Sequence, residues 1–169
     1  GATVDAITTA VVNGVAQTKT ITREIFANPV PLCAFGTVAD LAVATNFQDL
    51  WWGSPAGAES GWGINLTHQG DTIFGTWFTY GADGSPLWLT VTAPKVAPQL
   101  YSGTLYRTSG PPFSATPFDP ASVGRTPVGT ATFTFADGNR AAFAYAVDTV
   151  AQSKQITRQV FRAPGTVCA

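Results

Sequence analysis

The stretch ESGWGINLTHQGDTIFGTWFTYGADGSPLWL, residues 59–89, decides the fold class of this chain. Two tight-turn signals, His68-Gln69-Gly70-Asp71 and Gly81-Ala82-Asp83-Gly84, separate segments in which apolar and polar residues alternate. Alternation with a period of two is typical of half-buried strands, and a short turn joins antiparallel neighbours. The stretch therefore predicts three consecutive antiparallel strands. We expect them near residues 61–68, 72–80 and 86–93.

The same pattern extends outward in both directions. Asn13-Gly14 is a strong hairpin signal, because a type I′ turn needs positive φ at both central residues. Further strands are expected near residues 4–12, 15–27, 100–107, 128–136, 140–147 and 150–161. The stretches 28–60 and 108–127 are rich in Pro, Gly, Ala and Ser and are expected to be loops or linkers that carry at most short elements. Together these signals predict an all-β fold, an antiparallel meander barrel of about eight strands, with a β-sandwich as the alternative.

Composition limits the class of protein and its partners. The chain has 169 residues, of which 45% are hydrophobic and 11% charged, as expected of a folded domain. A formal net charge of −1 gives no electrostatic reason to expect nucleic acid as a partner. There is no apolar run long enough for a membrane span, and no motif indicates a cofactor.

Residues 12–34, VNGVAQTKTITREIFANPVPLCA, recur without a gap at residues 147–169, VDTVAQSKQITRQVFRAPGTVCA. We interpret residues 1–34 as the C-terminal hairpin of a preceding repeat, packed on the main domain, and residues 35–169 as one complete repeat unit. The hairpin is expected to pair along a sheet edge, preferably that of its own chain, and otherwise that of a neighbouring molecule. The protein would then be a monomer or a hairpin-swapped oligomer.

Cys33 and Cys168 occupy equivalent positions in the two copies of this segment. We predict a disulfide between them, because a low lysine content and many Thr and Gly residues suit an exported protein. Two cysteines and one histidine lack the spacing of a zinc site, so no metal is expected. The cationic residues at spacing four within the two copies are interpreted as solvated outer faces. They are Lys19, Arg23, Lys154 and Arg158.

Turn positions also predict which residues share a face, because hairpin loops set the register of strands. Centring the two turns on Gln69-Gly70 and Ala82-Asp83 aligns Trp62, Trp77 and Trp88 on one face of the sheet. The opposite face is nearly pure hydrocarbon and is expected to be core. Its members are Phe74, Phe78, Leu87, Leu89 and Val91.

The tryptophan face leaves two interpretations open. Aromatic rings beside hydroxyl and amide groups suit a saccharide or a small aromatic ligand, which stacks on the rings and is hydrogen-bonded at its edges. The same rings are typical of a sheet covered on both sides, where they are core. The residues expected to contact a ligand are Trp51, Trp52, Trp62, Trp77, Trp88, Glu59, Asn65 and His68.

The residues equipped for catalysis are Glu59, His68 and Asp71. His68 and Asp71 flank one turn, so the carboxylate can orient the imidazole, but a simple ion pair explains them equally well. No GxSxG or HExxH signature is present. We therefore interpret the chain as a non-enzymatic ligand-binding module. The alternatives are a structural or adhesive repeat of a larger protein, and a hydrolase that uses these three residues.

The elements ESGWG at 59–63, HQGD at 68–71 and TWFTY at 76–80 resemble those of a tandem-repeat module of exported bacterial proteins, to which no activity is assigned. The likeness covers Asp49 to Phe161. It implies a repeat unit and secretion or display at the bacterial cell surface. Gly75-Thr76-Trp77 at a strand entry, followed by successive hairpins, is also similar to avidin-like and calycin-like barrels, which bears on the fold alone.

Overall fold

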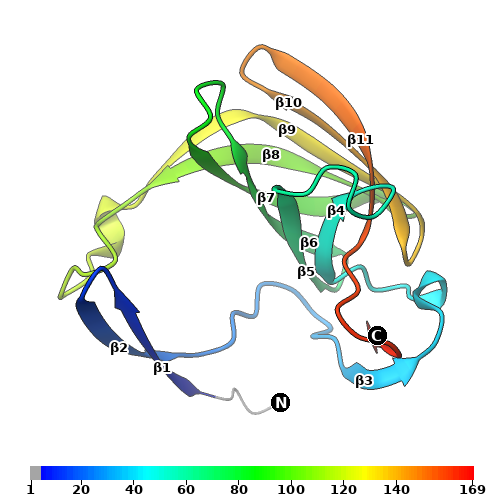
Figure 1. Cartoon of the computed structure of the whole chain (residues 1–169), viewed down its shortest axis with the longest axis horizontal. Coiled ribbons are helices and arrows are strands. Elements are labelled where there is room, and N and C mark those ends of the chain that lie inside the picture. Colours follow the sequence, from blue (N-terminus) through cyan, green and yellow to red (C-terminus); the bar gives the residue numbers. More distant parts are fainter. Residues whose placement is uncertain (1–4) are drawn as a thin grey trace.

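The computed structural model describes residues 5–169, and its centre is a closed barrel of antiparallel strands (Figure 1). The barrel strands follow one another along the chain, and the last pairs with the first, so no strand edge is left open. They are β4 (Asp49–Gly53), β5 (Gly63–Gln69), β6 (Thr72–Tyr80), β7 (Pro86–Ala97), β8 (Leu100–Ser109), β9 (Gly124–Asp137), β10 (Arg140–Val147) and β11 (Val150–Arg158). The predicted eight-stranded meander barrel is confirmed, and the sandwich alternative is wrong.

Two small sheets lie outside the barrel. β1 (Ala6–Val12) pairs with β2 (Val15–Ile21), and β3 (Cys33–Val38) pairs with β12 (Gly165–Cys168). The helices of the described part are two single turns, η1 (Leu41–Val43) and η2 (Pro120–Ser122), and neither could cross a membrane. Residue 4, where the first predicted strand begins, lies outside the described residues.

The N-terminal hairpin does not join its own barrel. Asn13 and Gly14 have φ of 50° and 79°, which confirms the type I′ turn. Among the described residues, however, β1 and β2 pair only with each other, and Figure 1 shows the hairpin standing away from the barrel. The prediction that it pairs along a sheet edge of its own chain is wrong, because β11 pairs with β4 and closes the barrel.

The predicted loops contain strands that the sequence did not reveal. β3 and β4 lie within the stretch 28–60, and β12 was not predicted. β9 begins at Gly124, inside the stretch 108–127. These segments are short or contain Gly and Pro, so their strand character depends on a partner strand rather than on their own alternation.

The two central turns are longer or placed differently than predicted. Between β5 and β6 the loop is Gly70-Asp71, with Gln69 opposite Thr72, so Leu66 faces Gly75 instead of Ile73. This shift of two leaves each side chain on its predicted face.

Between β6 and β7 the loop has an odd number of residues, Gly81–Ser85, since Tyr80 pairs with Pro86. Asp83 holds this loop by accepting bonds from the amide and the hydroxyl of Ser85 at 3.0 and 2.6 Å. An odd loop moves the register by one, which exchanges the two faces of the next strand. Trp77 therefore lies opposite Leu89, and the predicted alignment of Trp77 with Trp88 is wrong.

Side chains of alternate residues fill the barrel interior. Leu89 and Val91 belong to it as predicted, but Phe74 is 37% exposed on the outer wall, so its assignment to the core is wrong, as is that of Phe78. The buried cluster comprises Phe47, Trp51, Ile64, Leu66, Ile73, Trp77, Leu89, Val91, Ala93, Tyr101, Leu105, Ala131, Phe133, Phe135, Ala141, Phe143 and Ile156. Burial of this much apolar surface is the main stabilising contribution to the fold.

Candidate functional site

The five tryptophans do not form one surface. Trp51 and Trp77 are 0% and 5% exposed and belong to the core, whereas Trp88 is 65% exposed on the outer wall. Trp62 is half-buried and packs against the core from one side, and Trp52 is half-buried on β4. The expectation of a shared tryptophan face is therefore wrong for Trp88, because the odd β6–β7 loop turns it outward.

Glu59, His68 and Asp71 are held by separate partners. The ring of His68 is buried, with Nδ1 accepting a bond from the amide of Phe47 at 3.0 Å. Its Nε2 lies 3.2 Å from the hydroxyl of Tyr101. Asp71 is exposed and pairs with Lys95 at 3.0 Å. The structure thus gives His68 a packing role and does not supply an Asp-oriented imidazole.

Glu59 belongs to a different cluster, near Trp62. Its Oε2 accepts bonds from Trp62 Nε1 at 2.9 Å and from Lys154 Nζ at 2.6 Å. Lys154 also lies 5.4 Å from the centroid of the Trp62 ring, within cation–π range. Hydrogen bonds from Lys154 and Trp62 lower the pKa of the Glu59 carboxyl. The cluster joins the 54–62 loop to β11, which is a structural contact between segments far apart in the sequence.

Arg158 is the largest departure from the predicted solvated faces. It is 3% exposed, and its guanidinium donates bonds to the carbonyls of Asn46, Gln48 and Gly138. It also pairs with Asp49 at 3.1 Å. Burial lowers the pKa of this guanidinium, and Asp49 opposes that effect. The interpretation of Arg158 as an outward-facing residue is wrong, because its buried guanidinium binds carbonyls of the loop that precedes β4.

Residues 24–32, which we call the strap, are held against the barrel by Gln69. This glutamine is 3% exposed, and its Oε1 accepts bonds from the amides of Phe26 and Ala27 at 3.0 and 3.3 Å. Its Nε2 donates to the carbonyl of Glu24 at 2.9 Å. One side chain thus binds three main-chain groups of the strap. The sequence predicts Gln69 as a turn residue and gives no signal for this contact.

Three further contacts fix the strap. The amide of Gly70 donates to the carbonyl of Pro29 at 3.0 Å, and a Cβ at Gly70 would clash with the main chain of Asn28. The ring of Phe26 lies 6.4 Å from that of Phe74 on the outer wall, measured between centroids. This separation is within the range of favourable aromatic pairs, so the two rings hold the strap against β6.

The far end of the strap is joined to the C-terminus. The main chains of Leu32 and Ala169 exchange two hydrogen bonds, both of 2.9 Å. Cys33 and Cys168 form the predicted disulfide, next to the pairing of β3 with β12. The two equivalent cysteines of the repeated segment are thus bonded to each other.

A cavity of about 700 Å³ lies between the strap and the outer wall of β5–β7. Its volume is in the range of small-molecule sites. Of the residues predicted to bind ligand, Asn65 lines it, whereas the tryptophans and Glu59 do not. Its lining combines apolar and polar side chains, among them Phe26, Val30, Pro31, Phe74, Gln48, Asn65, Thr67, Thr92, Arg23 and Glu24.

The described residues contain no cluster of three or more His, Cys, Asp or Glu side chains that could hold a metal ion. Comparison of the chain with protein-family models, with curated proteins and with solved structures gives no significant match. We therefore infer the function from the geometry of this chain.

Proposed function

We propose that this chain is a non-enzymatic structural repeat module of an exported protein, in which the strap holds the preceding segment in a fixed position on the barrel. The main observation in support of this proposal is the contact between Gln69 and the strap. A buried side chain that binds three backbone groups fixes the course of the strap. The disulfide adds a covalent connection and suits an oxidising compartment.

The filled barrel supports the same role. Aromatic and aliphatic side chains occupy its interior, so the barrel acts as a rigid body rather than as a container. Rigid units joined by fixed connectors are the basis of repeat arrays. The strap provides such a connector because its backbone has defined partners at both ends.

Hydrogen exchange tests this function. In the unsubstituted protein we expect slow exchange at the amides of Phe26, Ala27 and Gly70. Gln69→Leu removes three hydrogen bonds, which together contribute about 2–4 kcal/mol to holding the strap. Exchange at Phe26 and Ala27 should accelerate by at least about tenfold while the barrel amides stay protected. Gln155→Leu, an exposed change on β11, is the matched control.

The proposal fails if Phe26 and Ala27 already exchange like an unfolded chain in the unsubstituted protein. It also fails if Gln155→Leu and Gln69→Leu loosen the strap equally. Either result would show that the connector is not fixed by the contact we describe.

Ligand binding is the second candidate function, and the cavity under the strap favours it. Amide and hydroxyl groups of Asn65, Thr67 and Thr92 stand beside the ring of Phe74. This combination suits a saccharide or a small aromatic compound. We expect hits from a glycan and aromatic-fragment screen by NMR to be lost in Asn65→Ala and kept in Gln155→Ala. A screen without hits on the folded protein would remove this candidate.

A further inference from the structure

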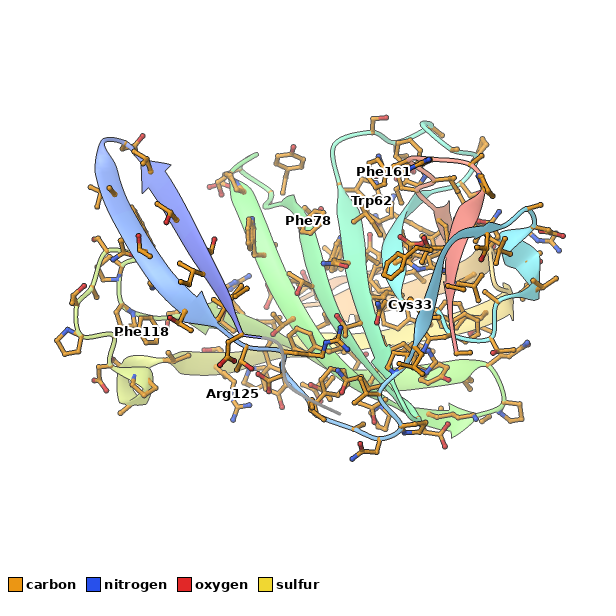
Figure 2. The ribbon with its side chains drawn as sticks, turned by 90° about the horizontal axis from the view of Figure 1, so that it is seen from below. Cys33, Trp62, Phe78, Phe118, Arg125 and Phe161 are labelled. Carbon is orange, nitrogen blue, oxygen red and sulfur yellow. A yellow bond between two sulfur atoms is a disulfide. The ribbon has the colours of Figure 1, made fainter. Side chains whose placement is uncertain are left out.

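The β1–β2 hairpin carries a face that its own barrel does not cover. On this face Val12, Val15 and Ile21 are 44%, 42% and 49% exposed. Lys19 reaches the 110–122 loop, where its Nζ is 3.4 Å from the carbonyl of Phe113. Figure 2 shows Phe118 of this loop beside the hairpin, and Lys19 lies 5.6 Å from its ring. An isolated two-stranded hairpin is marginally stable in water, so these strands are suited to a larger sheet.

The β10–β11 hairpin, which closes the barrel, shows what kind of sheet the β1–β2 hairpin fits. β11 is the counterpart of β2 in the repeated segment, β10 stands in the place of β1, and the two hairpins have the same register. Val12 pairs with Val15 in the first, and Val147 pairs with Val150 in the second. Every later pair in the two hairpins follows from these, so each residue of β2 has a defined counterpart in β11.

On the side of β11 that belongs to the barrel interior, every residue is the same in the first copy. On β11, Ile156 is in the core, Arg158 is buried and Lys154 bonds Glu59. Gln152 on the same side bonds the hydroxyl of Tyr145. The first copy has the same residue at each of these positions. They are Gln17, Lys19, Ile21 and Arg23.

Of the three outward positions between them, two differ, and Thr22 is the same as Thr157. Ser153 and Gln155 of β11 correspond to Thr18 and Thr20 of β2. Packing constrains inward residues far more than outward ones, so this distribution is the one expected of a strand that lines a barrel. In the present structure these inward-type residues have no interior to enter, as the exposed Ile21 shows.

We propose that the β1–β2 hairpin closes a second barrel, whose other strands come from another unit of this type as equivalents of β4–β9. The inference rests on the proposed function, since it assigns a partner to the segment that the strap connects. In that barrel Ile21 takes the place of Ile156. Lys19 reaches the counterpart of Glu59, and Arg23 binds loop carbonyls as Arg158 does here.

The inward side of β1 specifies the partner further. Thr8 and Ala10 stand where β10 has Phe143 and Tyr145. Phe143 is fully buried and stacks on Phe133 at 5.0 Å between centroids. A barrel closed by β1 therefore has room for bulkier side chains from the partner. The partner is a unit of this barrel type with larger interior residues opposite β1, rather than an identical copy.

The test adds a second copy of the barrel strands β4–β9 to the N-terminal end of the whole chain. Residues 35–139 are placed before residue 5, so that the hairpin 5–23 stands where residues 140–158 stand in the complete barrel. The substitutions Thr8→Phe and Ala10→Tyr give β1 the large inward side chains that β10 has at these positions. The matched control carries residues 140–158 in place of 5–23, which restores a complete native barrel.

We expect the added barrel of the Thr8→Phe and Ala10→Tyr protein to unfold cooperatively, like that of the control. Amides of β2 should exchange about 100-fold more slowly than in the single chain. Ile21→Asp should abolish this protection, whereas Thr20→Asp, on the outward side, should keep it. Without the two bulk-restoring changes, the added barrel should melt at a lower temperature.

The proposal is overturned if the β2 amides exchange as in the single chain while the control closes its added barrel. It is also overturned if Ile21→Asp and Thr20→Asp have equal effects, because the hairpin would then have no inward face. Protection of Phe26 and Ala27 in the single chain is measured separately, so a failure here is distinguishable from a failure of the strap as a connector.

Discussion

Replacing Arg158 with methionine tests whether one buried guanidinium secures the end of the barrel. Its donors reach three main-chain carbonyls, those of Asn46, Gln48 and Gly138, and the carboxylate of Asp49. Methionine keeps much of the side-chain volume but has no donor. Because the partners are main-chain groups, they stay in place and lose their hydrogen bonds.

The expected loss follows from these contacts. Hydrogen bonds to a charged donor contribute about 1.5–3 kcal/mol each, but water replaces part of this where the carbonyls are only partly buried. The ion pair itself adds little, since the Asp49 side chain is 32% exposed. We expect Arg158→Met to lower the free energy of unfolding by about 3–5 kcal/mol. In a chain of this size that corresponds to a melting temperature lower by about 6–20 °C.

Urea unfolding followed by tryptophan fluorescence and by circular dichroism measures the effect. Arg140→Met is the control, because Arg140 is 75% exposed and pairs only with the neighbouring turn residue Asp137 in the described structure. That change should cost less than about 1 kcal/mol. A loss of less than about 1 kcal/mol for Arg158→Met as well would refute the argument that the guanidinium secures these carbonyls.

Three further predictions concern titration, packing and the disulfide. Burial lowers the pKa of His68 below 6.5, so the unfolded state takes up the proton first as the pH falls. The free energy of unfolding should therefore be lost below pH 6.5, by up to about 1.4 kcal/mol per pH unit until the folded-state pKa is reached. Since the chain has one histidine, His68→Asn should flatten urea-derived stabilities between pH 7.5 and 5.5, and equal slopes in both proteins would contradict this assignment. Trp77→Ala should cost about 3–5 kcal/mol in urea unfolding, and Trp88→Ala less than about 1 kcal/mol; similar losses would contradict the assigned faces. Reduction of Cys33–Cys168 should lower the free energy of unfolding by about 4–5 kcal/mol in the chain-entropy model, whereas a Cys33→Ser, Cys168→Ser protein should not respond to reductant.

The sequence predicted those features that depend on local signals. Alternation and tight turns gave the meander barrel, and Asn13-Gly14 gave the turn that the structure has. The repeated segment pointed to the pairing of Cys33 with Cys168. Each of these features is determined by residues close in sequence or by equivalence between two copies.

Register was predicted less well, because it depends on loop length. Ala82-Asp83 looks like the centre of an even loop, but the bonds from Ser85 to Asp83 close an odd one. One residue of difference turned Trp88 out to the wall that carries Phe78 and brought Leu89 and Val91 to the face of Trp77. Residue type alone does not distinguish the two loops, so the candidate ligand surface could not be derived from the sequence.

The repeated segment shows why identical residues can have different environments. Arg158 is buried among carbonyls of its own barrel, whereas Arg23, its counterpart, is exposed at the edge of the cavity under the strap. Phe26 packs on Phe74, whereas Phe161, its counterpart, is 76% exposed.

In each pair the residue type is the same, so the difference comes from the presence or absence of the surface that the residue fits. Exposure of a residue in one copy is thus not evidence that it is a surface residue, when its counterpart in the other copy is buried. By this argument the exposed side chains on the inward side of β2 indicate a missing neighbour rather than a solvated face. Their identity with the interior side of β11 indicates what kind of neighbour it is.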